Sequence, residues 1–278
     1  KVLENETEET VTNEKPVLPS LDNNIINGNS LIDLEMLKDA TTDELISINP
    51  FSFNNINGGN KFDLIIGNPP YVKTEDMIKL QNKKEVQAYK SEYYVAYKQF
   101  DKYFLFIQRA IDLVKDSGEV CYIVPNKFIN NVSGEKIREL ISENKYLKMF
   151  IDFNYQQVFK DKTIYSSIIL LNKNKEENFE YCYINSYAEW IINNKSNIYT
   201  NINCNEIDKN PWILSMDIEK MKELKKLFNN SIQLSEIAIP FNGVQTSLNK
   251  IYVIKGKEVI GEDEKYVIIK KNNKEYKI

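Results

Sequence analysis

The sequence contains no histidine, and this absence removes a large part of enzyme chemistry from consideration. Serine–histidine triads, cysteine–histidine dyads, HExxH zinc sites and histidine bases are all excluded. Any reaction must therefore rely on carboxylates, amides, aromatic rings or backbone groups. No metal site is predicted.

Cysteine and long apolar runs are also scarce. The three cysteines, Cys121, Cys182 and Cys204, lie far apart and form no CxxC pair. This usage predicts a reduced, cytoplasmic protein without a disulfide framework. No apolar run approaches the roughly 18 residues that a membrane span needs, so no membrane partner is expected.

Arginine is rare as well, because 34 of the 36 basic residues are lysine. Residues 1–60 hold 3 basic and 11 acidic residues, whereas residues 61–278 hold 33 basic and 29 acidic residues. The main part of the chain is thus mildly basic. This charge is compatible with a polyanionic partner but does not require one.

Apolar patterning predicts an α/β fold. Short apolar runs at 62–66 and 120–124 fit buried strands, and the spacing within 93–116 predicts a helix that Ser117 and Gly118 end. Strands alternating with helices favour a largely parallel sheet. Two later strands, 164–171 and 179–184, are joined by a short polar loop, so we expect them to pair antiparallel.

Composition changes along the chain predict three parts. Residues 1–22 resemble a flexible leader, and residues 23–205 form the α/β domain. Residues 206–278 begin a second, mixed α+β domain, which includes an amphipathic helix at 216–228 and several short strands.

The most informative string is Asp63-Leu64-Ile65-Ile66-Gly67-Asn68-Pro69-Pro70-Tyr71. Ligands of open α/β sheets bind at the carboxyl ends of strands, where this string places its polar residues. The two prolines fix the backbone and remove two donors, leaving carbonyl oxygens and the Asn68 amide oxygen as acceptors. The rigid segment Asn68–Tyr71, called the arch below, suits a planar amino group. Its two acceptors take both amino hydrogens and free the nitrogen lone pair, while Tyr71 stacks on the substrate.

This string resembles the catalytic motif of the N6-adenine DNA methyltransferases, which use S-adenosylmethionine and occur in restriction–modification systems. The resemblance implies a Rossmann-like methyltransferase sheet and a double-stranded DNA substrate from which adenine is flipped. It implies that Asn68 and the Pro69 carbonyl accept hydrogen bonds from N6, that Pro70 shapes the arch and that Tyr71 stacks on the base. Asn68 and Pro70 would also contact the cofactor.

Other segments resemble the same family in the family's order. Ile26–Leu31 is similar to the segment whose acidic residue binds the cofactor adenine; Asn29 holds that position, and Ser30 replaces the stacking aromatic residue. Phe159 and Lys162 fall in the segment whose phenylalanine packs on the flipped adenine. Three of these residues have a structural alternative: a turn residue for Asn29, a core aromatic for Phe159 and a solvated surface lysine for Lys162.

The chain departs from the family in lacking the Gly-rich cofactor loop, because no GxG occurs anywhere. We therefore expect a fragment of a longer polypeptide, with a possible fused nuclease, that alone binds S-adenosylmethionine weakly or not at all and is inactive. The second domain resembles the start of a DNA-recognition domain.

Four alternatives remain open: methylation of a protein glutamine, of an RNA base or of cytosine N4, and a degenerate, non-catalytic specificity module.

Overall fold

The computed structural model describes residues 24–53, 56, 59–159, 164–192, 199–232, 234–239, 258–262, 265–271 and 274–277. The leader predicted at 1–22 lies outside the described residues. The chain divides into two compact units, Lys1–Lys226 and Leu227–Ile278, and each is described by itself. This division falls farther along the chain than the predicted boundary at 205/206, and the roles assigned to the two parts stay predictions.

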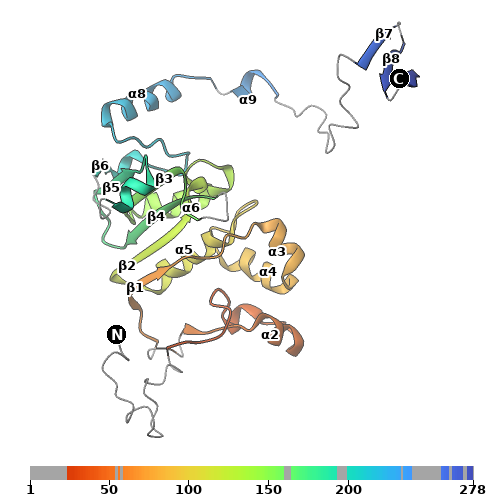
Figure 1. The fold of residues 1–278 in the computed structure, drawn as a ribbon. Helices are drawn as coiled ribbons and strands as arrows, with labels where there is room; N and C mark the ends of the chain where they lie inside the picture. The colour runs from red at the N-terminus through yellow and green to blue at the C-terminus, as the bar shows by residue number, and fades with distance from the viewer. Residues whose placement is uncertain are drawn as a thin grey trace, which may run out of the picture. The chain divides into compact units, whose positions relative to one another are not determined.

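The elements of the larger unit are, in chain order, η1 (Leu34–Leu37), α2 (Thr42–Ile48), β1 (Phe62–Gly67), α3 (Thr74–Leu80), α4 (Lys83–Glu92), α5 (Lys102–Leu113), β2 (Val114–Pro125), η4 (Asn126–Ile129), η5 (Val132–Gly134), α6 (Glu135–Glu143), β3 (Leu147–Gln157), β4 (Tyr165–Asn172), β5 (Asn178–Tyr183), α7 (Tyr187–Ile192), β6 (Thr200–Asn203), η6 (Cys204–Glu206) and α8 (Ile218–Asn229) (Figure 1). Helix α8 runs past the division, and the smaller unit holds α9 (Leu234–Ile237), β7 (Val259–Glu262), β8 (Val267–Lys271) and β9 (Lys274–Lys277). In the described part of the chain, no helix is long and apolar enough to span a membrane.

The main sheet has six strands in the order β1-β2-β4-β3-β5-β6. Strands β1 and β2 are parallel, as are β3 and β5. Strand β4 runs antiparallel to both of its neighbours, and β6 runs antiparallel to β5. The sheet is therefore mixed and not largely parallel as predicted, because β4 and β6 run opposite to their neighbours. The connection 158–164 between β3 and β4 is too short for the crossover that a parallel pair needs. The α/β class that the strand–helix alternation predicts is confirmed.

The predicted pairing of 164–171 with 179–184 is wrong. These segments correspond to β4 and β5, which run in opposite directions as expected, but β3 lies between them in the sheet. A short loop limits the distance between two strand ends, yet it does not require the strands to be neighbours. The order is instead set by the buried faces, which tertiary packing decides.

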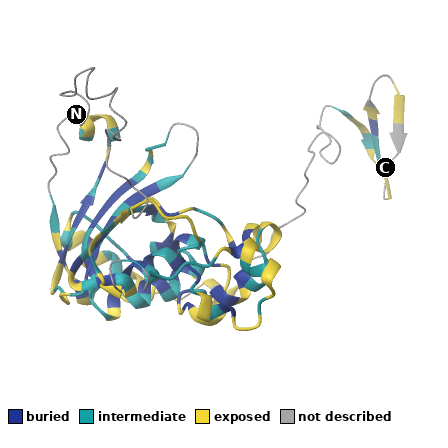
Figure 2. Ribbon diagram, turned by 90° about the horizontal axis from the view of Figure 1, so that it is seen from below, coloured by how far each residue is buried: buried dark blue, intermediate teal, exposed yellow. Residues whose placement is uncertain are grey.

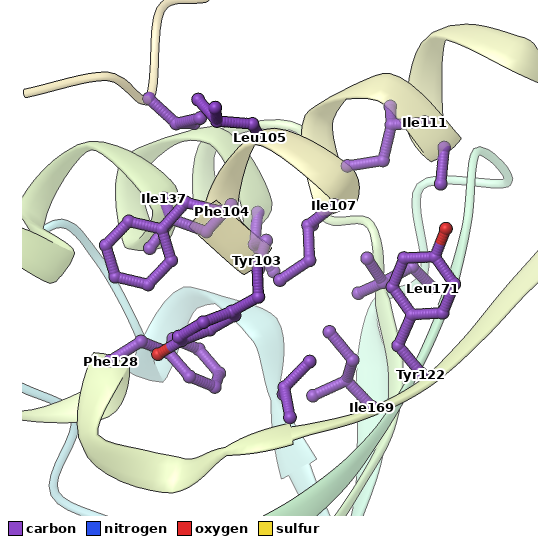
Figure 3. Packing of buried hydrophobic residues seen from close by; sticks show 14 of the residues in the cluster. Tyr103, Phe104, Leu105, Ile107, Ile111, Tyr122, Phe128, Ile137, Ile169 and Leu171 are labelled. Atoms are coloured by element: carbon purple, nitrogen blue, oxygen red, sulfur yellow. The ribbon is translucent and has the colours of Figure 1, made fainter. Parts of the chain in front are cut away.

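Helix α5 supplies the largest block of core side chains. Its residues Tyr103, Phe104, Ile107 and Ile111 lie on one face and point toward the sheet, where Ile169 of β4 is fully buried (Figure 3). The apolar spacing predicted this face correctly. Figure 2 shows the same asymmetry in the helices of this unit, with one buried and one exposed side.

The helix predicted at 93–116 is shorter than expected at both ends. Tyr93 caps the end of α4, and Lys98 has a φ of 53°, in the left-handed region, which interrupts any continuous helix. At the other end, Val114 already belongs to β2. Gly118, predicted as a helix stop, lies inside that strand, where an added Cβ would lie 2.7 Å from the Asp63 carbonyl oxygen.

Strand β1 forms as predicted but is not buried. Leu64 is 52% exposed and Ile66 is 71% exposed. Among the described strands, β1 has one neighbour, β2, and stands at the edge of the sheet. The run of apolar residues therefore predicted the strand, whereas its burial depends on neighbours that sequence periodicity does not define.

Candidate active site

The Asn68–Tyr71 segment follows β1 directly and begins with a close backbone contact. Gly67 lies opposite Tyr122 of β2, and a Cβ at Gly67 would lie 3.0 Å from the Tyr122 ring. Glycine thus lets the chain leave the sheet over an aromatic ring. Pro69 is buried and anchors the arch, while Asn68 and Pro70 are exposed. The Asn68 side chain makes no hydrogen bond to any described residue, so its amide oxygen is available to a ligand.

Tyr71 is held in a fixed orientation. Its hydroxyl donates a hydrogen bond to the Ile123 carbonyl oxygen at 3.0 Å, and its ring packs edge to face on Tyr103 of α5, with 6.1 Å between centroids. Partial burial raises the pKa of Tyr71 to about 12, so the phenol stays protonated and remains a donor at neutral pH. The half-buried ring can therefore offer a surface for stacking without first losing conformational freedom.

Backbone hydrogen bonds join the segment after the motif to the start of α5. The Lys102 amide donates to the Val72 carbonyl oxygen at 2.8 Å, and the Thr74 amide donates to the Phe100 carbonyl oxygen at 3.1 Å. These bonds place the amino end of α5 beside the motif. The helices α3 and α4 lie between the two segments in the chain (Figure 1).

Asn29 lies in a polar cluster of side chains. Its Nδ2 donates to Glu85 Oε1 at 3.0 Å and to the Tyr89 hydroxyl at 3.4 Å, and its Oδ1 accepts from the Leu31 amide at 3.2 Å. An amide oxygen has two lone pairs, so one acceptor position of Asn29 remains for a ligand. The structure thus shows the turn role of Asn29 and leaves the cofactor role as a prediction.

Ser30 lines a cavity of about 310 Å³ that extends along β1. The lining is mainly apolar and comes from β1, from β2, from α5 and from Phe53. Besides Ser30 it consists of Phe53, Phe62, Leu64, Ile65, Ile66, Phe106, Arg109, Ala110, Leu113 and Tyr122. Ser30 and Ile66, which is two residues before Asn68, both line this cavity. The predicted cofactor segment and β1 therefore line the same cavity, although they are far apart in the sequence.

Phe159 lies in the connection between β3 and β4 and is half-buried. Strand β3 is parallel to β2, because both are antiparallel to β4, so the carboxyl end of β3 lies at the same edge of the sheet as the motif. Two strands separate β1 from β3, which corresponds to roughly 14 Å across the sheet. Lys162 lies outside the described residues.

Glu85 and Lys102 form a buried polar cluster that the sequence did not reveal. The Lys102 Nζ lies 3.5 Å from Glu85 Oε1, and the two side chains are 13% and 10% exposed. The Tyr89 hydroxyl donates to the same Glu85 oxygen. Burial lowers the pKa of Lys102, and the Glu85 carboxylate opposes that shift. Only the four-residue spacing of Glu85 and Tyr89 on α4 was visible in the sequence.

Two further carboxyl groups lie at the carboxyl edge of the sheet. Asp152, at 7% exposure, accepts hydrogen bonds from Asn126 Nδ2 at 2.9 Å and from the Asn154 amide at 2.8 Å. Burial raises the pKa of Asp152, and these two donors oppose the rise. Burial also raises the pKa of Asp101, which the nearby Lys73 and Lys127 oppose.

The fold and this site together define a class: a Rossmann-like α/β domain with an amide–proline–aromatic arch at the carboxyl edge of its sheet. The chain belongs to the Eco57I restriction-modification methylase family, which matches residues 4–159. The resemblance stated from the motifs is thereby confirmed.

The chain is similar to several individual proteins. The chain is 42% identical, over 92% of its length, to the type II restriction enzyme and methyltransferase RM.Eco57I of Escherichia coli, and it spans 25% of that protein. It is 24% identical, over 73% of its length, to the type II methyltransferase M.BstVI of Geobacillus stearothermophilus, and spans 39% of it. A methyltransferase subunit of a type I restriction–modification system from Streptococcus thermophilus is a solved structure with 18% identity and a TM-score of 0.39, covering 56% of this chain and 37% of its own.

Proposed function

We propose that this chain forms the catalytic part of a restriction–modification DNA methyltransferase that transfers a methyl group from S-adenosylmethionine to the N6 amino group of adenine. The observation that carries the proposal is the exposed Asn68 amide, which bonds no described residue, near the fixed Tyr71 ring at the carboxyl end of β1. Membership of the methylase family supports the reaction class. The chain spans about a quarter of its Escherichia coli relative, so the activity of the whole protein is part of the proposal.

The motif would bind the target amino group through two acceptors. Asn68 Oδ1 and the Pro69 carbonyl oxygen would each accept one N–H hydrogen bond from N6. Held in this way, the nitrogen lone pair is withdrawn from conjugation with the purine ring and is free to attack the methyl group. The methylated nitrogen then releases one proton to water. Catalysis consists mainly of positioning, which fixed acceptors provide at little entropic cost.

Aromatic side chains would hold the base flat. The Tyr71 ring stacks on one face, and the hydrogen bond to Ile123 keeps that ring in place. Phe159 would close the other face from the connection after β3, and Lys162 would contact the base or a phosphate. Stacking on one base is worth roughly 1–3 kcal/mol, enough to offset part of the cost of extruding it from the duplex.

The described residues fit part of a bound S-adenosylmethionine. The free acceptor position of Asn29 suits the cofactor's adenine amino group, and the apolar cavity beside Ser30 has room for a flat ring. The cofactor would supply the electrophilic methyl group. Pro70 and Asn68 would limit the space around that group, and Glu85 would keep the Asn29 amide from rotating.

The direct test uses the longest natural polypeptide that contains these 278 residues. It is incubated with duplex DNA and methyl-labelled S-adenosylmethionine, the DNA is digested to nucleosides, and the labelled nucleoside is identified by mass spectrometry. Label in N6-methyladenine is the expected result. Label in cytosine would move the substrate to N4, and unlabelled DNA would refute the proposal in favour of a protein, an RNA or a non-catalytic role.

Asn68→Ala tests the role of the motif in the same assay. Loss of one of two acceptors on the reacting nitrogen is expected to lower the transfer rate by at least about 100-fold. The melting temperature should stay unchanged, because the Asn68 side chain bonds no described residue of the fold. A variant that keeps most of the transfer activity would contradict the assignment.

A further inference from the structure

Two lysines near the carboxyl edge of the sheet, unlike neighbouring lysines, form no ion pair with a described carboxylate. Lys73 follows Tyr71 by two residues, and Lys127 follows Pro125, the last residue of β2, by two residues. Both are exposed. Strands β1 and β2 are parallel, so the segments that follow them leave the sheet at one edge, the edge of the Asn68–Tyr71 motif.

Neighbouring lysines are already neutralised by carboxylates of the chain. Lys98 lies 3.9 Å from Glu135, and Lys102 lies 3.5 Å from the buried Glu85. The ammonium groups of Lys73 and Lys127, in contrast, form no ion pair or hydrogen bond within the part of the chain that the structure describes. Both ammonium groups are exposed, so an external anion can reach them.

Asp101 connects the two lysines. Lys73 and Asp101 pair through an isolated antiparallel bridge, which fixes their backbones side by side. The Asp101 carboxyl group is half-buried at the amino end of α5 and interacts electrostatically with both Lys73 and Lys127. Lys73 and Lys127 therefore both lie within electrostatic range of one half-buried carboxyl group, in the segments that follow two adjacent parallel strands.

We propose that Lys73 and Lys127 bind backbone phosphates of DNA next to the base that enters the Asn68–Tyr71 site. This inference rests on the proposed function and names the residues that anchor the duplex at that site. Two cations in the segments that follow adjacent parallel strands, near an arch that takes one base, match a polyanion whose charges flank that base. Phosphate contacts of this kind set position without reading sequence.

The test is the salt dependence of duplex binding. The same polypeptide, with a duplex that it methylates, is titrated at 50–200 mM NaCl, and the logarithm of the association constant is plotted against the logarithm of salt concentration. Each lost phosphate contact reduces the slope by about 0.9, so Lys73→Ala and Lys127→Ala should each weaken binding about 8-fold at 0.1 M salt. The double variant should lose about 1.8 from the slope, and arginine at both positions should restore it.

Lys148→Ala is the matched control. Lys148 lies at the amino end of β3, pairs with Glu119 at 2.5 Å and is 42% exposed. Its removal changes the net charge by the same amount, at the other end of the strands. The slope of this variant should equal that of the unaltered protein. An equal fall in all three single variants would mean that overall charge, not a local contact, drives binding.

The outcomes separate this inference from the proposed function. If no DNA is methylated, the slopes are measured on a duplex chosen for tight binding. A fall for Lys73→Ala and Lys127→Ala would then support the phosphate contacts, while the proposed methyl transfer to DNA would be refuted. If DNA is methylated and both slopes equal the unaltered one, the contacts are refuted and the reaction stands. Absence of duplex binding at 50 mM NaCl refutes the contacts outright.

Discussion

Replacement of Glu85 by alanine tests whether the buried cluster holds the cofactor segment against α4. The variant leaves the Lys102 ammonium group, which is 13% exposed, without its carboxylate, and it removes the acceptor of the Asn29 and Tyr89 hydrogen bonds. Breaking a buried pair by removing one partner typically costs 3–5 kcal/mol. Because both side chains keep slight exposure, we expect a loss of about 3 kcal/mol in the free energy of unfolding.

The assay is urea unfolding at pH 7, followed by tryptophan fluorescence. Both tryptophans, at positions 190 and 212, belong to the larger unit, so the signal reports the unit that contains Glu85. The control is the double variant Glu85→Gln/Lys102→Met. Glutamine keeps an acceptor for Asn29 and Tyr89, and methionine removes the charge that would be left unpaired.

The double variant should unfold within about 1 kcal/mol of the unaltered protein, because replacing both members of a buried pair is often close to neutral. A cost below about 1 kcal/mol for Glu85→Ala would show that water solvates Lys102 well without its partner. A double variant as unstable as Glu85→Ala would show that packing, not charge, sets the loss. Either result would refute the reasoning.

Three further predictions concern the sheet and its carboxyl edge. Gly118→Ala places a methyl group against the β1 backbone and should lower the free energy of unfolding, measured by thermal unfolding, by about 1–3 kcal/mol. Gly261→Ala is the control and should lower it little, because the nearest atom to its added Cβ lies 3.7 Å away. Equal losses in the two variants would contradict the close approach of Gly118 to β1. Tyr71→Phe removes the hydrogen bond to Ile123 and should lower stability by about 0.5–1.5 kcal/mol while DNA methylation persists, since the ring remains; loss of methylation would assign a chemical role to the hydroxyl. Burial raises the folded-state pKa of Asp152, so its ionisation destabilises the fold, and stability falls as pH rises from about 3.8 through the folded pKa. Asp152→Asn should therefore raise the melting temperature at pH 7 but not below pH 3.8. An unchanged melting temperature at pH 7 would contradict this prediction.

The local elements followed from the sequence because short-range patterns define them. The spacing of apolar residues identified the buried face of α5, and the apolar runs identified β1 and β2. The motif was readable for the same reason: Gly67, the two prolines and Tyr71 are adjacent in the chain, and their backbone preferences are local. The amphipathic helix predicted at 216–228 corresponds to α8.

Other features depend on contacts between distant residues, and the tertiary structure alone decided them. The position of β3 between β4 and β5 depends on which faces become buried together. The Asn29–Glu85–Lys102 cluster joins segments more than fifty residues apart, and no periodicity connects them. The exposure of Ile66 and the cavity beside Ser30 depend on which elements flank β1. Sequence thus determined the chemistry of the arch and its place at a strand end, because those are local. Tertiary structure determined its surroundings, because burial and ion pairing arise only when distant segments meet.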